Sequence, residues 1–344
     1  MPIIEAVGLS KEYKQYKRYA GLFGALRSLI TTSYTTHKAV DDITFSIEKG
    51  EAVGYLGPNG AGKSTMIKML TGILVPTSGH LTVKGHIPYR ARRENAKKIG
   101  VVFGQRSQLW WDLPVQDSFE LSKHIYKLPV ATYRQNFDFC VELLDMKEFI
   151  HKPVRQLSLG QRMRAEIAIA LLHEPDILFL DEPTIGLDVI AKDKIRTFLR
   201  TVNIDRKTTI LLTTHDLKDI EEICPRMIIV NRGNIVFDGL VEQLKQQLGQ
   251  EKTLTIKFSR DPGPFSLSNS ILHKDEGTLK TFTINRAERS IMTLLSELNQ
   301  QYDIEDISIQ EPDIEQVIRI LYNRLAEDLS SYSSERESAV SWSM

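Results

Sequence analysis

The chain has 344 residues, 42% of them hydrophobic, and its 44 lysines and arginines balance 44 aspartates and glutamates. This composition is that of an ordinary folded protein, with room for one large domain and a smaller one. The balanced charge disfavours nucleic acid as a partner, and no apolar run approaches the roughly 18 residues needed to cross a bilayer. We therefore expect a protein that lies at a membrane only through a partner.

Cysteine usage and the N-terminal sequence both favour a reducing, cytoplasmic compartment. Cys140 and Cys224 lie far apart in the sequence and lack a C-x-x-C spacing. Buried free thiols are therefore expected in place of a metal site or a disulfide. The first residues, MPIIEAVGLSKEYK, show no apolar run followed by a cleavage site.

An insertion over about residues 14–38 separates an early strand from a strand predicted at Ile43 to Ile47. Basic residues come first, and the apolar residues behind them fall at helical spacing: Leu22, Phe23, Leu26, Leu29 and Ile30. Two interpretations fit this pattern. One is a helix packed on its own domain, and the other is an amphipathic helix that lies on a membrane or a membrane protein.

The middle of the chain predicts an α/β domain with a parallel sheet. Short apolar runs recur between helical patterns, at Ala52 to Leu56, Ile99 to Phe103, Ile177 to Leu180, Ile210 to Thr214 and Met227 to Val230. Continuous apolar runs, as opposed to alternating ones, are typical of strands covered on both faces. Residues from about 107 to 175 contain no such run, so this part is predicted to be a helical subdomain.

The C-terminal part predicts a small α+β domain of ferredoxin-like type. After a helical connector, the expected elements are strands at Leu254 to Phe258 and Leu279 to Ile284, a helix from about Ala287 to Asn299, a strand at Ile304 to Ile309 and a helix from Asp313 to about Leu325. We expect the α/β domain over residues 1–240 and the small domain over 241–328. The serine-rich residues 329–344 are predicted to be disordered.

A glycine-rich loop carries the clearest chemistry. The spacing G-x-x-x-x-G-K-[ST] is met by Gly57, Gly62, Lys63 and Ser64, after an apolar run and before a helical pattern. With Gly60, these glycines allow backbone N–H groups to converge on a polyphosphate, at the positive end of the following helix. Lys63 would reach the outer phosphates, and Ser64 would bind Mg²⁺.

The run ILFLDEP places Asp181 and Glu182 at the carboxyl end of a predicted buried strand. Ligands bind at this end of the strands in parallel α/β sheets. Asp181 would help to hold Mg²⁺, and Glu182 would take a proton from the attacking water. The alternative is that both acids belong to a solvated turn.

A second anion site is predicted after the sequence LSLG. Ser158 can cap the helix that follows, and Gly160 keeps the approach to its N-terminus open. One nucleotide needs one such helix end, which the phosphate loop already supplies. The second helix end therefore predicts a second nucleotide, contributed in trans.

The ordered set GPNGAGKST, Gln105, LSLGQ, ILFLDEP, GLD and TTHD closely resembles an ATP-binding cassette (ABC) ATPase over about Ile3 to Gly239. In that family, two cassettes sandwich two ATP molecules, each bound by the phosphate loop of one subunit and the LSLGQ-type signature of the other. The resemblance implies the P-loop NTPase fold of an ABC cassette for residues 1–240, with ATP and Mg²⁺ as cofactors.

The matching positions imply roles for individual residues. The phosphate contacts are Gly57, Pro58, Asn59, Gly60, Ala61, Gly62, Lys63, Ser64 and Thr65. Mg²⁺ and the attacking water are assigned to Ser64, Gln105 and Asp181, and the partner's ATP to Ser158, Gly160 and Gln161. Glu182 is the implied general base, Asp188 spans the dimer seam, and His215 contacts the γ-phosphate.

Two further positions bear on the match to the family pattern. Tyr13 is expected to stack on adenine, with Tyr16 as a competitor. Leu159 stands where the family usually has glycine, but the site is expected to stay active because Ser158 and Gly160 remain.

The adjacent tryptophans Trp110 and Trp111 lie in the region that in this family receives the coupling helix of the membrane subunit. Both side chains belong to the core, or at least one of them contacts a permease, because tryptophan is a favoured interface anchor.

As a whole, the cassette resembles ATPases of the ABC-2 export type, which include bacterial drug, antibiotic and viologen exporters. The resemblance implies ATP hydrolysis coupled to export through separate integral-membrane permease subunits, on the inner face of the cell membrane. A second copy of this chain is favoured as the dimer partner over a paralogue. The alternatives are a polysaccharide or teichoic-acid exporter ATPase, and a non-transport ABC ATPase acting on ribosomes or DNA. The single cassette, the lack of sustained heptads and the balanced charge disfavour the last of these.

Overall fold

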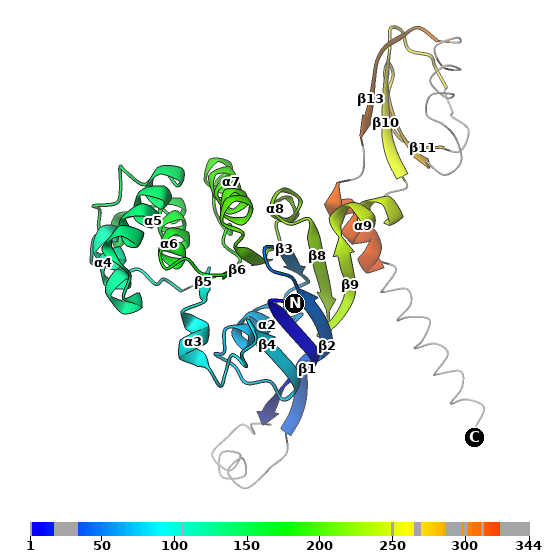
Figure 1. Ribbon diagram of the computed structural model, residues 1–344. Coiled ribbons are helices and arrows are strands. Elements are labelled where there is room, and N and C mark those ends of the chain that lie inside the picture. Colours follow the sequence, from blue (N-terminus) through cyan, green and yellow to red (C-terminus); the bar gives the residue numbers. More distant parts are fainter. Residues whose placement is uncertain are drawn as a thin grey trace, which may run out of the picture. The chain divides into compact units, whose positions relative to one another are not determined.

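The computed structural model describes residues 2–16, 34–104, 106–248, 251–264, 270–285, 298, 302–310 and 313–323. The expected helix around Leu26, residue Gln105, most of the helix expected from Ala287 to Asn299 and the serine-rich tail lie outside these residues. The chain divides into two compact units, Met1–Gly239 and Leu240–Met344 (Figure 1).

A six-stranded sheet forms the centre of the first unit. Its strands are, in order, β5 (Ile99–Phe103), β6 (Ile177–Asp181), β7 (Thr209–Thr213), β3 (Ala52–Leu56), β8 (Arg226–Asn231) and β9 (Asn234–Leu240). The pairings from β5 through to β8 are parallel. Every residue of β3 and β7 is buried, which explains why these strands appear in the sequence as continuous apolar runs. The predicted parallel sheet is confirmed.

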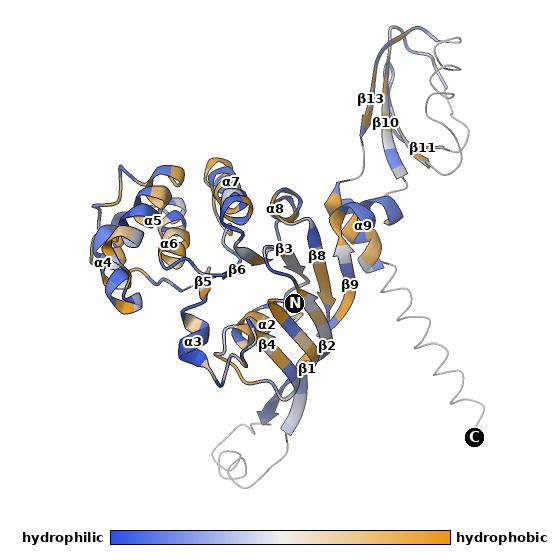
Figure 2. Ribbon diagram, in the orientation of Figure 1, coloured by the Kyte–Doolittle hydropathy of each residue, from blue (hydrophilic) through white to orange (hydrophobic). Residues whose placement is uncertain are grey.

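A second, antiparallel sheet belongs to the same unit. Its order is β2 (Tyr34–Ile47), β1 (Ile4–Tyr16) and β4 (Ser78–Val83). Apolar and polar residues alternate along the part of β2 that joins the core, where Ile43, Phe45 and Ile47 are buried and Thr44 is exposed (Figure 2). These strands pack with helix α2 (Lys63–Leu70) and the central sheet in one apolar core.

The two long strands of this sheet extend into the insertion expected over residues 14–38. The pairing of β1 with β2 continues outward to Tyr16 opposite Tyr34. The described ends of the insertion are therefore a β-hairpin arm. The sequence did not show this arm because its residues, from Tyr34 to Lys38, are exposed and leave no apolar pattern.

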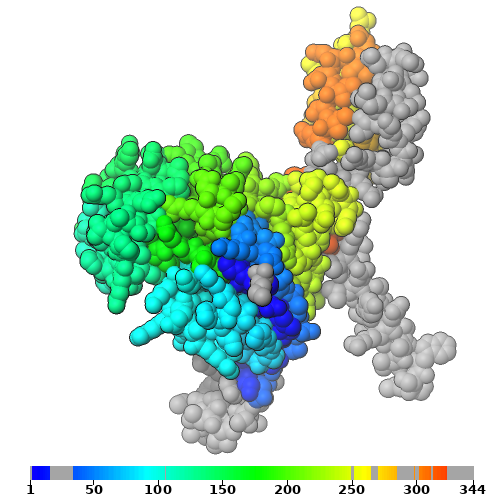
Figure 3. Space-filling model, viewed as in Figure 1, coloured from blue at the N-terminus to red at the C-terminus, as the bar shows by residue number. Residues whose placement is uncertain are grey.

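Residues 107–175, all of which the structure describes, contain helices and no strand. The helices are α4 (Val115–Tyr126), α5 (Val130–Leu143), the short η1 (Val154–Gln156) and α6 (Leu159–Leu171). Figure 3 shows the green residues of this subdomain projecting from one side of the unit. It follows α3 (Arg92–Ala96) and β5, and it leads into β6, so it is an insertion between two neighbouring strands of the sheet.

Two more helices follow the strands of the central sheet. Helix α7 (Val189–Arg206) connects β6 to β7, and helix α8 (Leu217–Ile223) connects β7 to β8. The residues between β6 and α7, and between β7 and α8, are therefore loops at the carboxyl ends of adjacent parallel strands. No described helix is both long and apolar enough to cross a membrane.

The second unit contains α9 (Val241–Leu248), an antiparallel sheet and a helix over residues 314–323. The sheet has the order β11 (Ser270–Glu276), β12 (Leu279–Asn285), β10 (Glu251–Phe258) and β13 (Ile304–Gln310). In chain order this is 2-3-1-4 with antiparallel neighbours, which is the strand arrangement of a ferredoxin-like domain. Leu254, Ile256 and Phe258 lie at alternate positions of β10 and form its core with β12.

Candidate nucleotide-binding site

The glycine-rich loop lies between β3 and α2, pressed against neighbouring backbone. A Cβ atom on Gly57 would lie 2.4 Å from the carbonyl oxygen of Val230. At Gly62 the φ angle is +99°, and a Cβ would lie 2.1 Å from the carbonyl oxygen of Ala39. Only glycine fits these two positions, because any side chain would push the loop away from β8 and β2. The loop therefore holds its backbone in the shape that an anion requires.

Lys63 begins α2 and folds back over this loop. Its side chain is buried, and its Nζ donates to the carbonyl oxygens of Gly57 at 2.7 Å and Pro58 at 3.2 Å. Burial lowers the pKa of Lys63, while the nearby Glu182 and Asp181 raise it. A polyphosphate is a stronger partner for an ammonium group than two neutral carbonyls, so the side chain is placed to exchange these bonds for phosphate contacts.

A cavity of about 330 Å³ opens above the loop. It is lined by Tyr13, His37, Ala39, Asn59, Gly60, Ala61, Gly62, Lys63, Ser64, Thr65 and Glu182. The structure therefore brings Tyr13 from β1 to the phosphate loop. The competitor Tyr16 lies three residues farther along β1, opposite Tyr34 in the strand pairing.

His37 is a cavity residue that the sequence did not reveal. It lies opposite Tyr13 in the pairing of β1 with β2. The insertion separates the two residues in the sequence, and only the pairing of the strands places both rings beside the phosphate loop.

The two predicted carboxylates follow one another at the end of β6. The Thr213 hydroxyl donates to Asp181 Oδ1 at 2.6 Å, and the backbone N–H of Glu182 donates to the Thr213 carbonyl at 2.9 Å. Glu182 has a φ angle of +55°, in the left-handed region that a glutamate rarely adopts. Backbone strain of this kind persists where the surrounding structure requires it, and it is concentrated at functional sites.

His215 extends from the loop after β7 toward the same point. Its Nδ1 lies 3.7 Å from Glu182 Oε2, and its side chain is 61% exposed. The two side chains thus come from the ends of adjacent parallel strands and meet beside the phosphate-loop cavity, which Glu182 lines. A base that contacts water and a polar group beside it are what hydrolysis of a phosphoanhydride requires.

The donors that remain suit Mg²⁺ held together with a nucleotide. Ser64 is exposed in the first turn of α2 and lines the cavity, and Asp181 has a second carboxylate oxygen. Within the described residues, no three His, Cys, Asp or Glu side chains form a cluster able to hold a metal alone. Mg²⁺ typically takes one or two protein ligands and completes its shell with phosphates and water, so the pair fits this ion.

Ser158 caps α6 as predicted from the sequence LSLG. Its Oγ accepts from the backbone N–H of Gln161 at 3.2 Å, and its own N–H donates to Gln161 Oε1 at 3.0 Å. This reciprocal capping box fixes the helix entry. Gly160 packs near Ala191 of α7, and the side chain of Leu159 is 40% exposed beside Gly186.

The capped end of α6 does not belong to the cavity above the phosphate loop. Among the described residues that line this cavity, none comes from α6. Asp188, at the start of α7, caps that helix through a 2.8 Å bond from the Ala191 N–H to its Oδ1. Within one chain, therefore, the phosphate loop and the LSLGQ helix end are separate surfaces.

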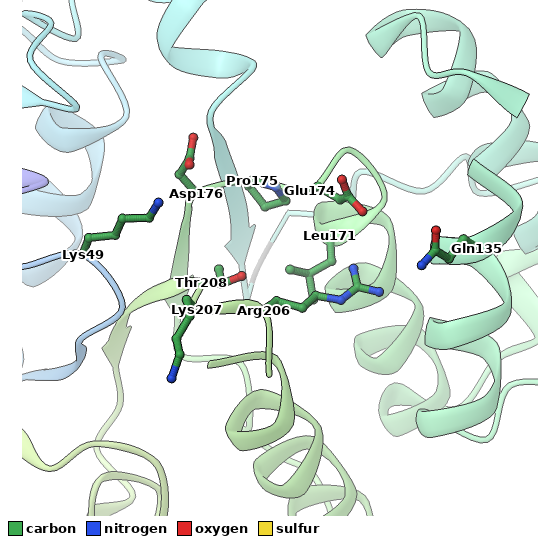
Figure 4. Close-up of a pocket in the computed structure, with 9 residues that line it drawn as sticks. All are labelled: Lys49, Gln135, Leu171, Glu174, Pro175, Asp176, Arg206, Lys207 and Thr208. Atoms are coloured by element: carbon green, nitrogen blue, oxygen red, sulfur yellow. The ribbon is translucent and has the colours of Figure 1, made fainter. Parts of the chain in front are cut away.

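A larger cavity, of about 410 Å³, lies at the opposite end of the central sheet. Asp176 precedes β6 and Thr208 precedes β7, and both line this cavity. Figure 4 shows Lys49 and Gln135 facing it from opposite sides. It has charges of both signs and no glycine-rich loop, so the cavity above Lys63 is the candidate nucleotide site.

The fold and the site together define a P-loop nucleotide-binding protein. A glycine-rich loop joins a parallel strand to a helix, and an acidic pair ends another strand of the same sheet.

Comparison with known proteins gives the family. Residues 40–185 match the family model described as ABC transporter. The ABC transporter ATP-binding protein NatA of Bacillus subtilis (strain 168) is 33% identical over 223 residues, which are 65% of this chain and 90% of NatA. The daunorubicin resistance ATP-binding protein DrrA3 of Streptomyces coeruleorubidus is 29% identical over 291 residues, 83% of this chain and 91% of DrrA3. The chain belongs to the family of ABC transporter ATP-binding proteins.

A solved structure agrees with this assignment. The ATP-binding cassette MJ0796, solved as a dimer in a post-hydrolysis state bound to ADP and Pi, aligns with a TM-score of 0.57 and 26% identity. The alignment covers 69% of this chain and 98% of that cassette. The predicted family and fold are confirmed, and ATP hydrolysis is the general activity of such cassettes.

Proposed function

We propose that this chain is the ATP-binding and hydrolysing subunit of an ABC-2 type export complex, which closes as a dimer around two ATP molecules and drives a separate membrane permease. One observation carries the dimer. The phosphate-loop cavity lacks any described residue of α6, while the N-terminus of α6 is capped, with Leu159 exposed. Each ATP then needs Ser158, Gly160 and Gln161 of a second cassette, which we propose to be another copy of this chain.

In the proposed site, residues 57–65 bind the phosphates: the backbone of residues 57–62 and the side chain of Lys63 contact them, and Thr65 adds a further contact. Ser64 and Asp181, with Gln105, would hold Mg²⁺, which when bound neutralises charge on the phosphates. Tyr13 stacks on adenine at the outer end of the cavity. Its place opposite His37 on the cavity wall supports this role.

Hydrolysis in this proposal depends on Glu182, which accepts a proton from the attacking water. His215 orients the γ-phosphate beside it, and Asp188 spans the dimer seam. The 3.7 Å approach of His215 to Glu182 supports both roles, because a base and a phosphate contact must act on one small volume. ATP binding closes the dimer, and hydrolysis reopens it.

Export of a small molecule is supported by the relatives. DrrA3 carries daunorubicin resistance in its name, and its match covers 83% of this chain. The exposed fractions of Trp110 and Trp111, 57% and 54%, support the permease as the partner of the helical subdomain. On this proposal the chain lies on the inner face of the cell membrane, held there by the permease.

The cassette occupies residues 1–240, and the small domain over 241–328 supports dimerisation or regulates turnover. The separate antiparallel sheet of the second unit, with its own apolar core, supports a distinct role for this domain.

The test is to recover the Glu182→Gln chain from gently solubilised membranes with ATP and Mg²⁺ and to identify every copurified polypeptide. A multi-span permease is expected, and its sequence would distinguish a drug exporter from a polysaccharide exporter. The Lys63→Met chain, which should not bind ATP, is the matched control. Recovery of ribosomal proteins or DNA without any membrane protein would overturn the proposal.

A further inference from the structure

A buried charged cluster lies beneath the two loops that carry Glu182 and His215. We call it the Asp219 cluster, and its members are Thr184, Arg196, Thr214 and Asp219. Each of the four residues is at most 2% exposed. Buried charges are uncommon because they lose hydration, so each one needs a reason.

Asp219 on α8 is the centre of the cluster. Its Oδ1 accepts a 2.6 Å bond from Arg196 Nε on α7. Its Oδ2 accepts from the hydroxyl of Thr214 at 3.1 Å and from the hydroxyl of Thr184. One carboxylate thus receives donors from three separate segments: helix α7, the loop after β6 and the loop after β7.

The two threonines connect this carboxylate to the proposed catalytic pair. Thr184 lies two residues after Glu182, and Thr214 directly precedes His215. Because both hydroxyls bind the same oxygen of Asp219, they hold the two loops at one fixed separation. The same two loops carry Glu182 and His215, and His215 Nδ1 lies 3.7 Å from Glu182 Oε2.

Helix α7 holds the second loop at another point as well. Lys192 Nζ donates to Asp216 Oδ2 at 2.5 Å, and Arg196 reaches the same oxygen at 3.3 Å. Asp216 follows His215 in the sequence. The loop that carries His215 is therefore bound to α7 on one side and, through Asp219, to the loop of Glu182 on the other.

We propose that Thr184, Arg196 and Asp219 are positioning residues for ATP hydrolysis, which fix the Glu182 carboxylate against His215. This inference rests on the proposed roles of Glu182 and His215. A buried ion pair is often no more stabilising than apolar residues of similar volume, so stability alone is a weak explanation for the pair. Small errors in the placement of a catalytic group cost about 10²-fold in rate. A rigid connection between the loops of Glu182 and His215 would therefore favour hydrolysis.

The most direct variant is Thr184→Val, which removes one hydroxyl and preserves the Arg196–Asp219 pair. Thr184→Ser keeps the hydroxyl and serves as the conservative variant. The matched control is Thr209→Val, because Thr209 is also a buried threonine and loses one bond, from the Gly50 N–H at 2.9 Å. Thr209 lies at the other end of the sheet, away from the proposed site.

For each full-length variant, kcat, KM, the Kd for an ATP analogue and Tm are measured. Thr184→Val should lower kcat about tenfold or more while the Kd stays within about twofold, and Thr184→Ser should recover most of kcat. The Tm of Thr184→Val should fall no further than the Tm of Thr209→Val. The Thr209→Val control should keep a normal kcat. Combined with His215→Ala, Thr184→Val should add less than its separate effect, because both changes disturb one geometry.

Three outcomes would overturn the inference: normal kcat in Thr184→Val, a loss of kcat matched by equal losses of affinity and Tm, or effects that multiply with those of His215→Ala. Failure of the proposed function is recognised separately. If Glu182→Gln hydrolyses ATP at the normal rate, the base assignment itself is wrong, whatever Thr184 does.

Discussion

The imidazole Nδ1 of His215 lies 3.7 Å from Oε2 of Glu182, at the ends of two adjacent parallel strands. Neither side chain is fully buried, since Glu182 is 28% exposed and His215 is 61% exposed. The pair therefore meets where water can enter, next to the loop that is shaped for phosphates. We expect a second cassette to cover this point when ATP is bound, because the helix end suited to its phosphates lies elsewhere in the chain.

Replacement of Lys63 by Met should abolish tight nucleotide binding. Its ammonium group folds over the phosphate loop, within hydrogen-bond distance of two carbonyl oxygens, and a bound polyphosphate would take these bonds. A loss of about 10²-fold or more in affinity is expected from the loss of a charge-assisted contact. Titration with a fluorescent ATP analogue measures it. Lys68→Met, on the same helix, is the control, and equal binding by both variants would contradict the assignment.

The adenine position is tested on the hairpin arm. Tyr13→Ala should weaken ATP binding about threefold to tenfold, since an aromatic stack contributes about 0.5–1.5 kcal/mol, whereas Tyr13→Phe should bind normally. Tyr34→Ala, an exposed tyrosine farther out on the same arm, should have no effect. Calorimetry of the three variants measures these affinities. If Tyr34→Ala weakened binding and Tyr13→Ala did not, the base would lie elsewhere on the arm.

The tryptophan pair should mark the surface that contacts the permease. The side chains of Trp110 and Trp111 are exposed, while their backbones are held by bonds to Ser118 and Arg155. Their joint replacement by Ala should therefore leave ATP binding and Tm nearly unchanged and reduce copurification with the permease several-fold. Ile125→Ala, at another exposed apolar position of the subdomain, is the control. Parallel losses of ATP binding and copurification would show that the pair is structural.

His173 gives the cassette a predictable loss of stability in acid. Burial lowers the pKa of His173 to about 4, and the bond between its Nε2 and the Ile99 carbonyl opposes that shift. Its other nitrogen, Nδ1, is buried and has no hydrogen-bond partner among the described residues, so a second ring proton would find no acceptor there. Stacking on Tyr126 encloses the ring further.

The direction of the effect follows from the two pKa values. Below about pH 6.5 the unfolded chain takes up a proton at this histidine, while the native protein does not until about pH 4. The contribution of His173 is therefore present above pH 6.5 and is lost as the pH falls toward 4. His173→Gln should flatten the dependence by about 2 kcal/mol between pH 6.5 and 4.5 in urea unfolding. The exposed His124→Gln should follow the native curve, and identical slopes for all three proteins would contradict the prediction.

The buried parts of the fold could be predicted because burial leaves a pattern in the sequence. All five residues of β3 are buried, and the run from Ala52 to Leu56 is continuously apolar. Strand β11 could not be predicted in this way, because every residue from Ile271 to Glu276 is exposed. The arm formed by β1 and β2 escaped prediction for the same reason, since an exposed strand needs no apolar face.

The site divides in a similar way. The phosphate loop and the adjacent acids Asp181 and Glu182 are local patterns, so their spacing alone indicated them. Thr184 and Asp219 lie 35 residues apart and meet only because β6 and β7 are neighbours. His37 reaches the cavity only through its pairing with Tyr13. Contacts of this kind depend on the sheet order, which local spacing does not reveal.

The most direct test of the account is the turnover and oligomeric state of purified Glu182→Gln with Mg²⁺ and ATP. Loss of the general base should lower the hydrolysis rate about 10²- to 10⁴-fold while ATP still binds. Light scattering during size-exclusion chromatography should then show a dimer that requires ATP and is absent with ADP. A monomer that binds ATP without dimerising would contradict the claim that two copies of this chain enclose the nucleotide. Normal turnover would contradict the claim that Glu182 is the general base whose reaction reopens the dimer.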